Sequence, residues 1–66
     1  MPVAKVIEIS VESAESFEDA IRSGIDHANK SVRNIEGAWV KEHQVVVKDG
    51  KITGFRVNLK VTFVLD

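Results

Sequence analysis

The sequence predicts an α+β domain with the order strand, helix, strand, strand, in which a three-stranded antiparallel sheet is wrapped on one helix. Three observations predict it. The chain has a β-branched stretch near its N-terminus, one helical stripe of apolar residues, and two strand-like stretches joined by Asp49-Gly50, of which the second alternates. Asp-Gly between such stretches is a strong signal for a two-residue hairpin turn. The 66 residues leave room for one domain, which we expect to span residues 1–66.

The first strand is predicted over Val3–Ile9, because this stretch is rich in β-branched residues. Ser10–Ala14 is then expected to be a short connection. Apolar residues do not alternate cleanly in Val3–Ile9, so the pattern leaves open which of its faces packs in the core.

The helix is predicted to begin after Ser16, a good N-cap residue, with Asp19 three positions later in the manner of a capping box. Apolar or small residues then recur at the spacing of one helical face. They are Phe17, Ala20, Ile21, Gly24, Ile25, Ala28, Val32 and Ile35. We expect the helix to close between Asn34 and Gly37. Gly24 lies inside the stripe and favours a close approach of the helix backbone to the sheet.

The remaining chain is predicted to be a hairpin. Its strands cover Gly37–Val47 and Ile52–Leu65. A two-residue turn sets the register, and three pairs are expected to oppose each other: His43 with Arg56, Lys41 with Asn58, and Trp39 with Lys60. Every other residue from Phe55 to Leu65 is apolar, so that side must meet the helix. The six paired residues are therefore expected on the sheet face away from the helix.

Trp39 on that face has two open interpretations. Either a neighbouring subunit covers the ring, or the ring is a stacking platform for a planar ligand. A core of this size is marginal, and the chain has no Cys for a disulfide. We therefore expect a homo-oligomer.

Composition and motifs argue against several functions. The net charge of −1 and the lack of a basic patch give no argument for nucleic-acid binding. The apolar runs are too short to span a bilayer. No leader segment is evident, so a cytoplasmic location is the default. No nucleophile–base pair, phosphate loop or metal triad is evident, so we do not expect an enzyme.

Four segments carry a resemblance to a known family. They are Lys5-Val6-Ile7-Glu8-Ile9, Ser16-Phe17-Glu18-Asp19-Ala20-Ile21, Trp39-Val40-Lys41-Glu42 and Val61-Thr62-Phe63-Val64-Leu65-Asp66. In this order and spacing they resemble the dodecin family along essentially the whole chain. The resemblance implies a hollow homododecamer, and in many members bound flavin that is stored, sequestered or quenched without catalysis.

The resemblance also implies two flavin contacts. A Trp near the start of the second strand stacks on the isoalloxazine ring, and a Gln on the third strand hydrogen-bonds it. In this chain the Trp position falls on Gly37 and the Gln position on Arg56, with Trp39 two residues further along the same face. Arg56 can donate hydrogen bonds but cannot accept them, so it would read a ring edge less completely than Gln.

We therefore expect a non-enzymatic, dodecin-like shell for FMN or riboflavin. The residues expected to bind the cofactor are Trp39, Gly37, Arg56, Lys41 and His43. The alternative is an assembly that binds calcium or another ion, or one with a purely structural role, because Arg56 without the stacking Trp also resembles the calcium-binding dodecins. The metal ligands of that branch are not carried over, and Glu8 and Glu42 are the carboxylate candidates.

Overall fold

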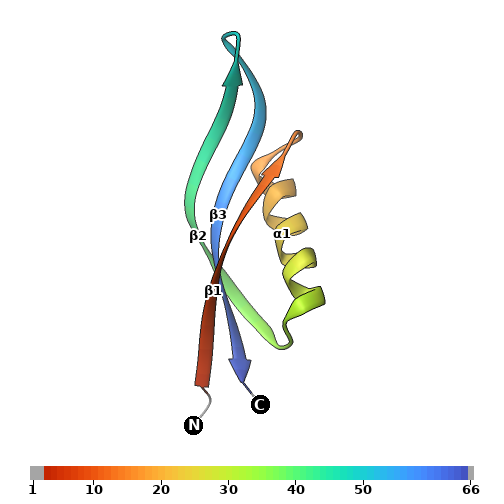
Figure 1. Ribbon diagram of the computed structural model, residues 1–66, viewed down its shortest axis with the longest axis vertical. Coiled ribbons are helices and arrows are strands. Elements are labelled where there is room, and N and C mark those ends of the chain that lie inside the picture. Colours follow the sequence, from red (N-terminus) through yellow and green to blue (C-terminus); the bar gives the residue numbers. More distant parts are fainter. Residues whose placement is uncertain (1–2, 66) are drawn as a thin grey trace.

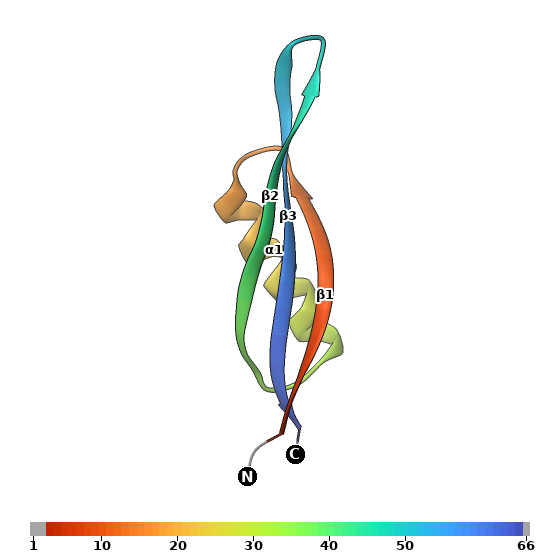
Figure 2. The same ribbon diagram turned by 90° about the vertical axis from the view of Figure 1, so that its left-hand side faces the viewer.

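The computed structural model describes residues 3–65 and has the predicted order of elements (Figure 1). These are β1 (Val3–Ser13), α1 (Phe17–Ser31), β2 (Ile35–Lys48) and β3 (Lys51–Leu65). The strand β3 is the centre of a three-stranded sheet and pairs antiparallel with β1 and β2. Figure 2 shows α1 against one face of this sheet. The predicted α+β class is confirmed, and Met1, Pro2 and Asp66 of the predicted domain lie outside the described residues.

The helix begins where the sequence indicated and ends earlier than expected. The Ser16 side chain accepts a hydrogen bond from the Asp19 backbone N–H at 2.9 Å, which satisfies a free donor of the first turn. After Ser31 the chain is extended at Val32, and Asn34 has a left-handed conformation with φ of 63°. Asn tolerates this conformation better than most residues. Ile35, predicted as part of the helical stripe, instead starts β2 and packs on the core.

The core lies between α1 and the middle of β3. Its fully buried side chains are Ala20, Val57, Leu59 and Val61. From β1, Ile7, Ile9 and Val11 pack against this cluster, which settles the face of the first strand that the sequence left open. β1 also runs on to Ser13, through the expected connection, because Val11 pairs with Val57 and continues the apolar face.

The hairpin turn is the predicted one. Asp49 and Gly50 both have positive φ, 52° and 76°, as a two-residue hairpin of the primed type requires. Lys48 pairs with Lys51 across it. The hairpin extends beyond the end of the helix in Figure 1, and the chain as a whole measures 51 × 19 × 14 Å.

The predicted hairpin register is wrong over its middle part. One shift between Val46 and Val47 leaves Thr53 as an extra residue on β3, and a second between Val40 and Glu42 leaves Lys41 as an extra residue on β2. These two bulges lie on opposite strands, so their effects cancel. The predicted pair of Trp39 with Lys60 is therefore confirmed.

Between the two bulges every β2 residue is paired one position away from the prediction. Gln44 pairs with Arg56, His43 with Val57 and Glu42 with Asn58. A slip of one residue turns a side chain to the other face of the sheet. His43 therefore lies on the side of buried Val57, towards the helix, and not beside Arg56.

Candidate functional site

The sheet face turned away from α1, called the outer face below, carries polar side chains from all three strands. Their positions follow from pairing with Arg56, Asn58 and Lys60, which alternate along β3 with the buried Val57, Leu59 and Val61. The edge-strand residues paired with them are Glu8, Ser10, Glu12, Trp39, Glu42 and Gln44.

Arg56 is held between the two edge strands. Its Nε and Nη2 donate to Glu12 Oε1 at 3.2 and 2.8 Å, and its Nη1 donates to Gln44 Oε1 at 3.4 Å. The Arg56 and Glu12 side chains are 43% and 50% exposed. An ion pair this exposed stabilises the fold by at most about 1 kcal/mol. The contacts therefore fix the direction of the guanidinium more than they stabilise the sheet.

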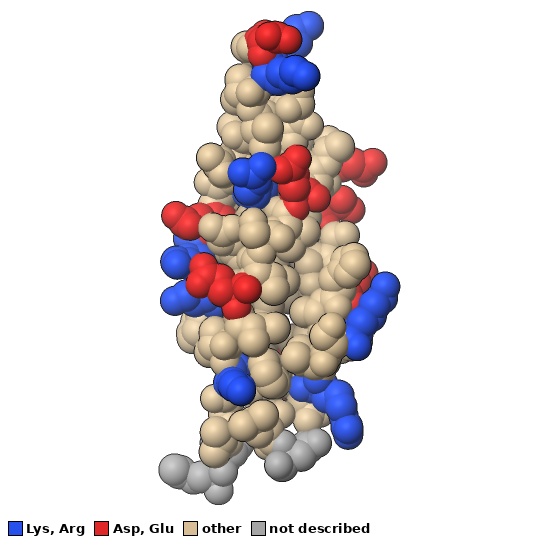
Figure 3. Space-filling view, viewed as in Figure 1, with Lys and Arg blue, Asp and Glu red and all other residues tan. Residues whose placement is uncertain are grey.

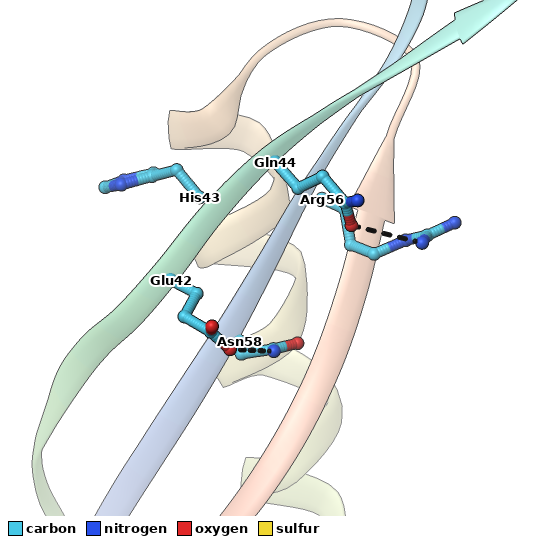
Figure 4. A pocket seen from close by; sticks show the side chains of 5 residues that line it. All are labelled: Glu42, His43, Gln44, Arg56 and Asn58. Atoms are coloured by element: carbon cyan, nitrogen blue, oxygen red, sulfur yellow. Dashed lines mark hydrogen bonds between the residues drawn. The ribbon is translucent and has the colours of Figure 1, made fainter.

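A second polar pair lies one step along the strands. Asn58 Nδ2 donates to Glu42 Oε1 at 2.8 Å. The Arg56–Gln44 pair and the Asn58–Glu42 pair line a pocket of about 260 Å³. His43 also lines it. Figure 4 shows Glu42 turned towards Asn58 and Gln44 towards Arg56.

The His43 side chain points away from the other four residues of this pocket (Figure 4). Its ring lies edge-on to Phe17 at the start of α1, with ring centroids 4.9 Å apart and an interplanar angle of 76°. The prediction that His43 shares the outer face with Trp39 and Lys41 is therefore wrong. Its physical cause is the extra residue Thr53 in β3.

Lys41 reaches over the central strand from its bulge. Its Nζ donates to Glu8 Oε2 of β1 at 3.2 Å. Lys60 of β3 pairs with Glu8 on one side and with Trp39 on the other. Among residues 3–65 the Lys60 amine has no hydrogen bond or ion pair, so it is the outer-face cation that remains available.

Trp39 is the large exposed aromatic of this face. The residue is 63% exposed. Gly37 lies on the same face, opposite Thr62, whose Oγ1 donates to the Gly37 carbonyl at 3.0 Å. A Cβ on Gly37 would meet that Oγ1 at an ordinary 3.6 Å, so the position has room for a side chain.

The outer-face carboxylates already have partners within the chain. Glu8 binds Lys41, Glu12 binds Arg56, and Glu42 binds Asn58. No group of three His, Cys, Asp or Glu side chains within residues 3–65 is arranged to hold a metal ion. The candidates Glu8 and Glu42 lie on one face but do not form a ligand set by themselves.

The rest of the surface has mixed charge and several exposed apolar residues. Acidic and basic side chains are interspersed over the face shown in Figure 3. Besides Trp39, the large apolar residues that are exposed are Val3, Val6, Val40, Val45, Val47, Ile52 and Leu65. No helix within the described part of the chain has the length and apolar character needed to cross a membrane.

The sequence interpretation missed Gln44, Glu42 and Glu12 as outer-face residues. For Gln44 and Glu42 the reason is the register between the two bulges. The consecutive Val45-Val46-Val47 could have indicated that the register here is uncertain, because three apolar residues in a row do not specify which face of the strand is buried. Glu12 was missed because β1 was expected to end at Ile9.

Comparison with known proteins gives one family. A family model described as Dodecin matches residues 3–66. A comparison with curated protein sequences finds no significant match.

Solved structures agree with this match. The chain is similar to a dodecin from Streptomyces davaonensis, with 34% identity, a TM-score of 0.92, and coverage of 98% of this chain and 96% of that one. A dodecin mutant from Thermus thermophilus has 29% identity, a TM-score of 0.93, and coverage of 100% and 98%. A protein from Mycobacterium tuberculosis described as a calcium dodecin has 33% identity, a TM-score of 0.84, and coverage of 97% and 91%.

Proposed function

Because the chain belongs to the dodecin family, we propose that it forms a non-enzymatic shell that binds and stores a flavin of the FMN or riboflavin type. Trp39 is the observation that carries this proposal. It is a 63% exposed aromatic residue beside the polar side chains of the outer sheet face. Planar rings stack on such a side chain with a gain of about 0.5–1.5 kcal/mol beyond the area that they bury.

The surroundings of Trp39 suit a planar ligand with polar edges. Gly37, on the same face two residues before Trp39, has no side chain and leaves room there. Lys60 opposes Trp39 and is the outer-face cation that has no partner among residues 3–65, so it is suited to an anionic tail such as the phosphate of FMN. Arg56 and Lys41 remain in the proposed site at its polar end. His43 is left out, because its ring packs against Phe17 on the other side of the sheet.

The proposal includes assembly into a hollow homododecamer. Two features support oligomerisation: the buried core is confined to a few side chains, and many large apolar residues are exposed. Chains of this size usually need a further source of stability. A cytoplasmic location, with no nucleic-acid or membrane partner, stays a prediction.

Variants of Trp39 test the proposal. We expect Trp39→Leu to weaken riboflavin binding by about 10-fold, and Trp39→Phe to weaken it less, because a smaller ring still stacks. Binding is followed by quenching of flavin fluorescence. Val47→Leu, at an exposed position near the hairpin tip, is the matched control and should bind as the parent does. Equal riboflavin affinity for Trp39→Leu and the parent would contradict the proposed stacking.

Calcium binding is the second candidate, and one observation favours it. Three carboxylates, Glu8, Glu12 and Glu42, lie on the same outer face, and the chain is 33% identical to the calcium dodecin. If several copies bring such carboxylates together, calcium should raise the melting temperature by linkage. Glu42→Gln should reduce that rise. A melting temperature that is the same in calcium and in EDTA would remove this candidate.

A further inference from the structure

We infer that Gln44, acting together with Arg56, is the residue that selects a ligand with an imide edge, that is, a ring N–H between two carbonyl groups. This inference rests on the proposed flavin function, because the pyrimidine-dione ring of a flavin has such an edge. It assigns to this chain a hydrogen-bonding residue on the second strand, where the resemblance placed only a stacking Trp.

The bulge at Thr53 is what brings Gln44 to this site. In an unbroken ladder from the Asp49-Gly50 turn, Gln44 would pair with Phe55 and face the helix. The extra residue moves the pairing by one, and Gln44 pairs with Arg56 on the outer face. The bulge ends at Lys41, where the second shift restores the original register. The two shifts therefore move the side chains from Glu42 to Val46 to the opposite sheet faces, while the pairs on either side keep the register set by the turn.

Arg56 alone supplies hydrogen-bond donors and nothing else. Two of its nitrogens, Nε and Nη2, are directed at Glu12, and Nη1 is directed at Gln44. Glu12 also balances the charge of the guanidinium. The Arg56 end of the pocket therefore favours a neutral hydrogen-bonding edge over an anionic group.

Gln44 adds the acceptor that Arg56 lacks. The Arg56 Nη1–H fixes the amide orientation, because the Gln44 oxygen must face that donor at 3.4 Å. A carbonyl oxygen has two lone pairs, and the adjoining amide nitrogen has two N–H groups. From Arg56 to Gln44 the polar atoms thus run donor, acceptor, donor.

An imide edge presents the complementary order: acceptor, donor, acceptor. Its two carbonyl oxygens can accept from Arg56 Nη1 and Gln44 Nε2, and its N–H can donate to Gln44 Oε1. Neither side chain offers this row by itself. The row lines the 260 Å³ pocket, which opens on the same sheet face as Trp39.

The test compares riboflavin with 3-methylriboflavin, in which a methyl group replaces the hydrogen of the imide N–H. Neither compound carries a phosphate, so Lys60 does not contribute to the difference. The parent protein should bind riboflavin about 10-fold or more tightly than the methyl analogue, because the analogue leaves a polar group of the site unpaired. Dissociation constants come from flavin fluorescence quenching, and light scattering checks that each variant is assembled.

Two substitutions then assign the preference to Gln44. Gln44→Leu removes donor and acceptor, and we expect roughly 3- to 10-fold weaker riboflavin binding with the preference over the methyl analogue largely lost. Gln44→Glu keeps an acceptor oxygen and should keep the preference. The control is Val46→Thr on the same face of β2, which should leave both affinities unchanged.

The outcomes separate this inference from the proposed function. If the parent protein binds riboflavin and its methyl analogue equally, or if Gln44→Leu keeps the preference, the role of Gln44 is overturned while flavin binding stands. If the parent protein binds neither compound, the proposed flavin function fails and this inference fails with it.

Discussion

Replacement of Gly24 by Ala tests the closest approach of α1 to the sheet. An ideal Cβ at Gly24 would lie 2.6 Å from Val11 Cγ2 and 3.2 Å from Leu59 Cδ1. Leu59 is fully buried, and Val11 has a short, branched side chain with little freedom to turn aside. The added methyl group must therefore displace the helix or change the Val11 rotamer.

Two opposite terms set the size of the effect. Ala is favoured over Gly in a helix by about 1 kcal/mol. An extra methyl group in a packed contact costs about 1–3 kcal/mol. We therefore expect a net loss of up to about 2 kcal/mol, and a loss of about 1 kcal/mol lowers the melting temperature of a domain this small by about 4–8 °C.

Circular dichroism melts at one fixed protomer concentration measure this effect, because the stability of an oligomer depends on concentration. Ser23→Ala, at the exposed neighbouring position, gains helix propensity without a contact and should melt slightly higher than the parent. Val11→Ala should relieve the Gly24→Ala strain, so that the double variant loses about 1 kcal/mol less than the sum of the single losses. A Gly24→Ala protein that melts as high as Ser23→Ala would refute the reasoning.

Three further predictions follow from individual contacts. Ser16→Ala should destabilise the fold by about 1 kcal/mol, because the Asp19 N–H loses its acceptor, and Ser16→Asp should not; urea unfolding measures both. Gly50→Ala should cost roughly 1–2 kcal/mol in the same assay, because φ at Gly50 is 76°. The double variant Gly37→Trp with Arg56→Gln restores the two flavin contacts that the family resemblance implies and should bind riboflavin about 10-fold more tightly; an unchanged affinity would contradict that alignment.

Features encoded by local sequence were predictable. The Ser16 cap, the helical stripe from Phe17 to Ala28 and the Asp49-Gly50 turn each depend on a few neighbouring residues, and the structure confirms these three features. The alternation from Phe55 to Leu65 also predicted which residues of β3 are buried, since Val57, Leu59 and Val61 form the core.

Features that depend on tertiary pairing were not predictable in the same way. A bulge is one unpaired residue whose place depends on the twist of two long strands, and neither Thr53 nor Lys41 has a distinctive local sequence. The assignment of His43 to the outer face failed for this reason, and Gln44 was overlooked for the same reason. Trp39, which lies outside the stretch between the bulges, was placed on the correct face, and so was Arg56, whose face follows from the alternation along β3.

The most direct test of the proposed function is a riboflavin titration followed by the emission of Trp39. Trp39 is the one Trp of the sequence, so its emission reports on this site without interference. We predict saturable quenching of Trp39 at micromolar riboflavin, with flavin emission quenched over the same concentrations. Trp39 emission that stays constant, after correction for light absorbed by the flavin, would contradict the proposal that this face binds the cofactor.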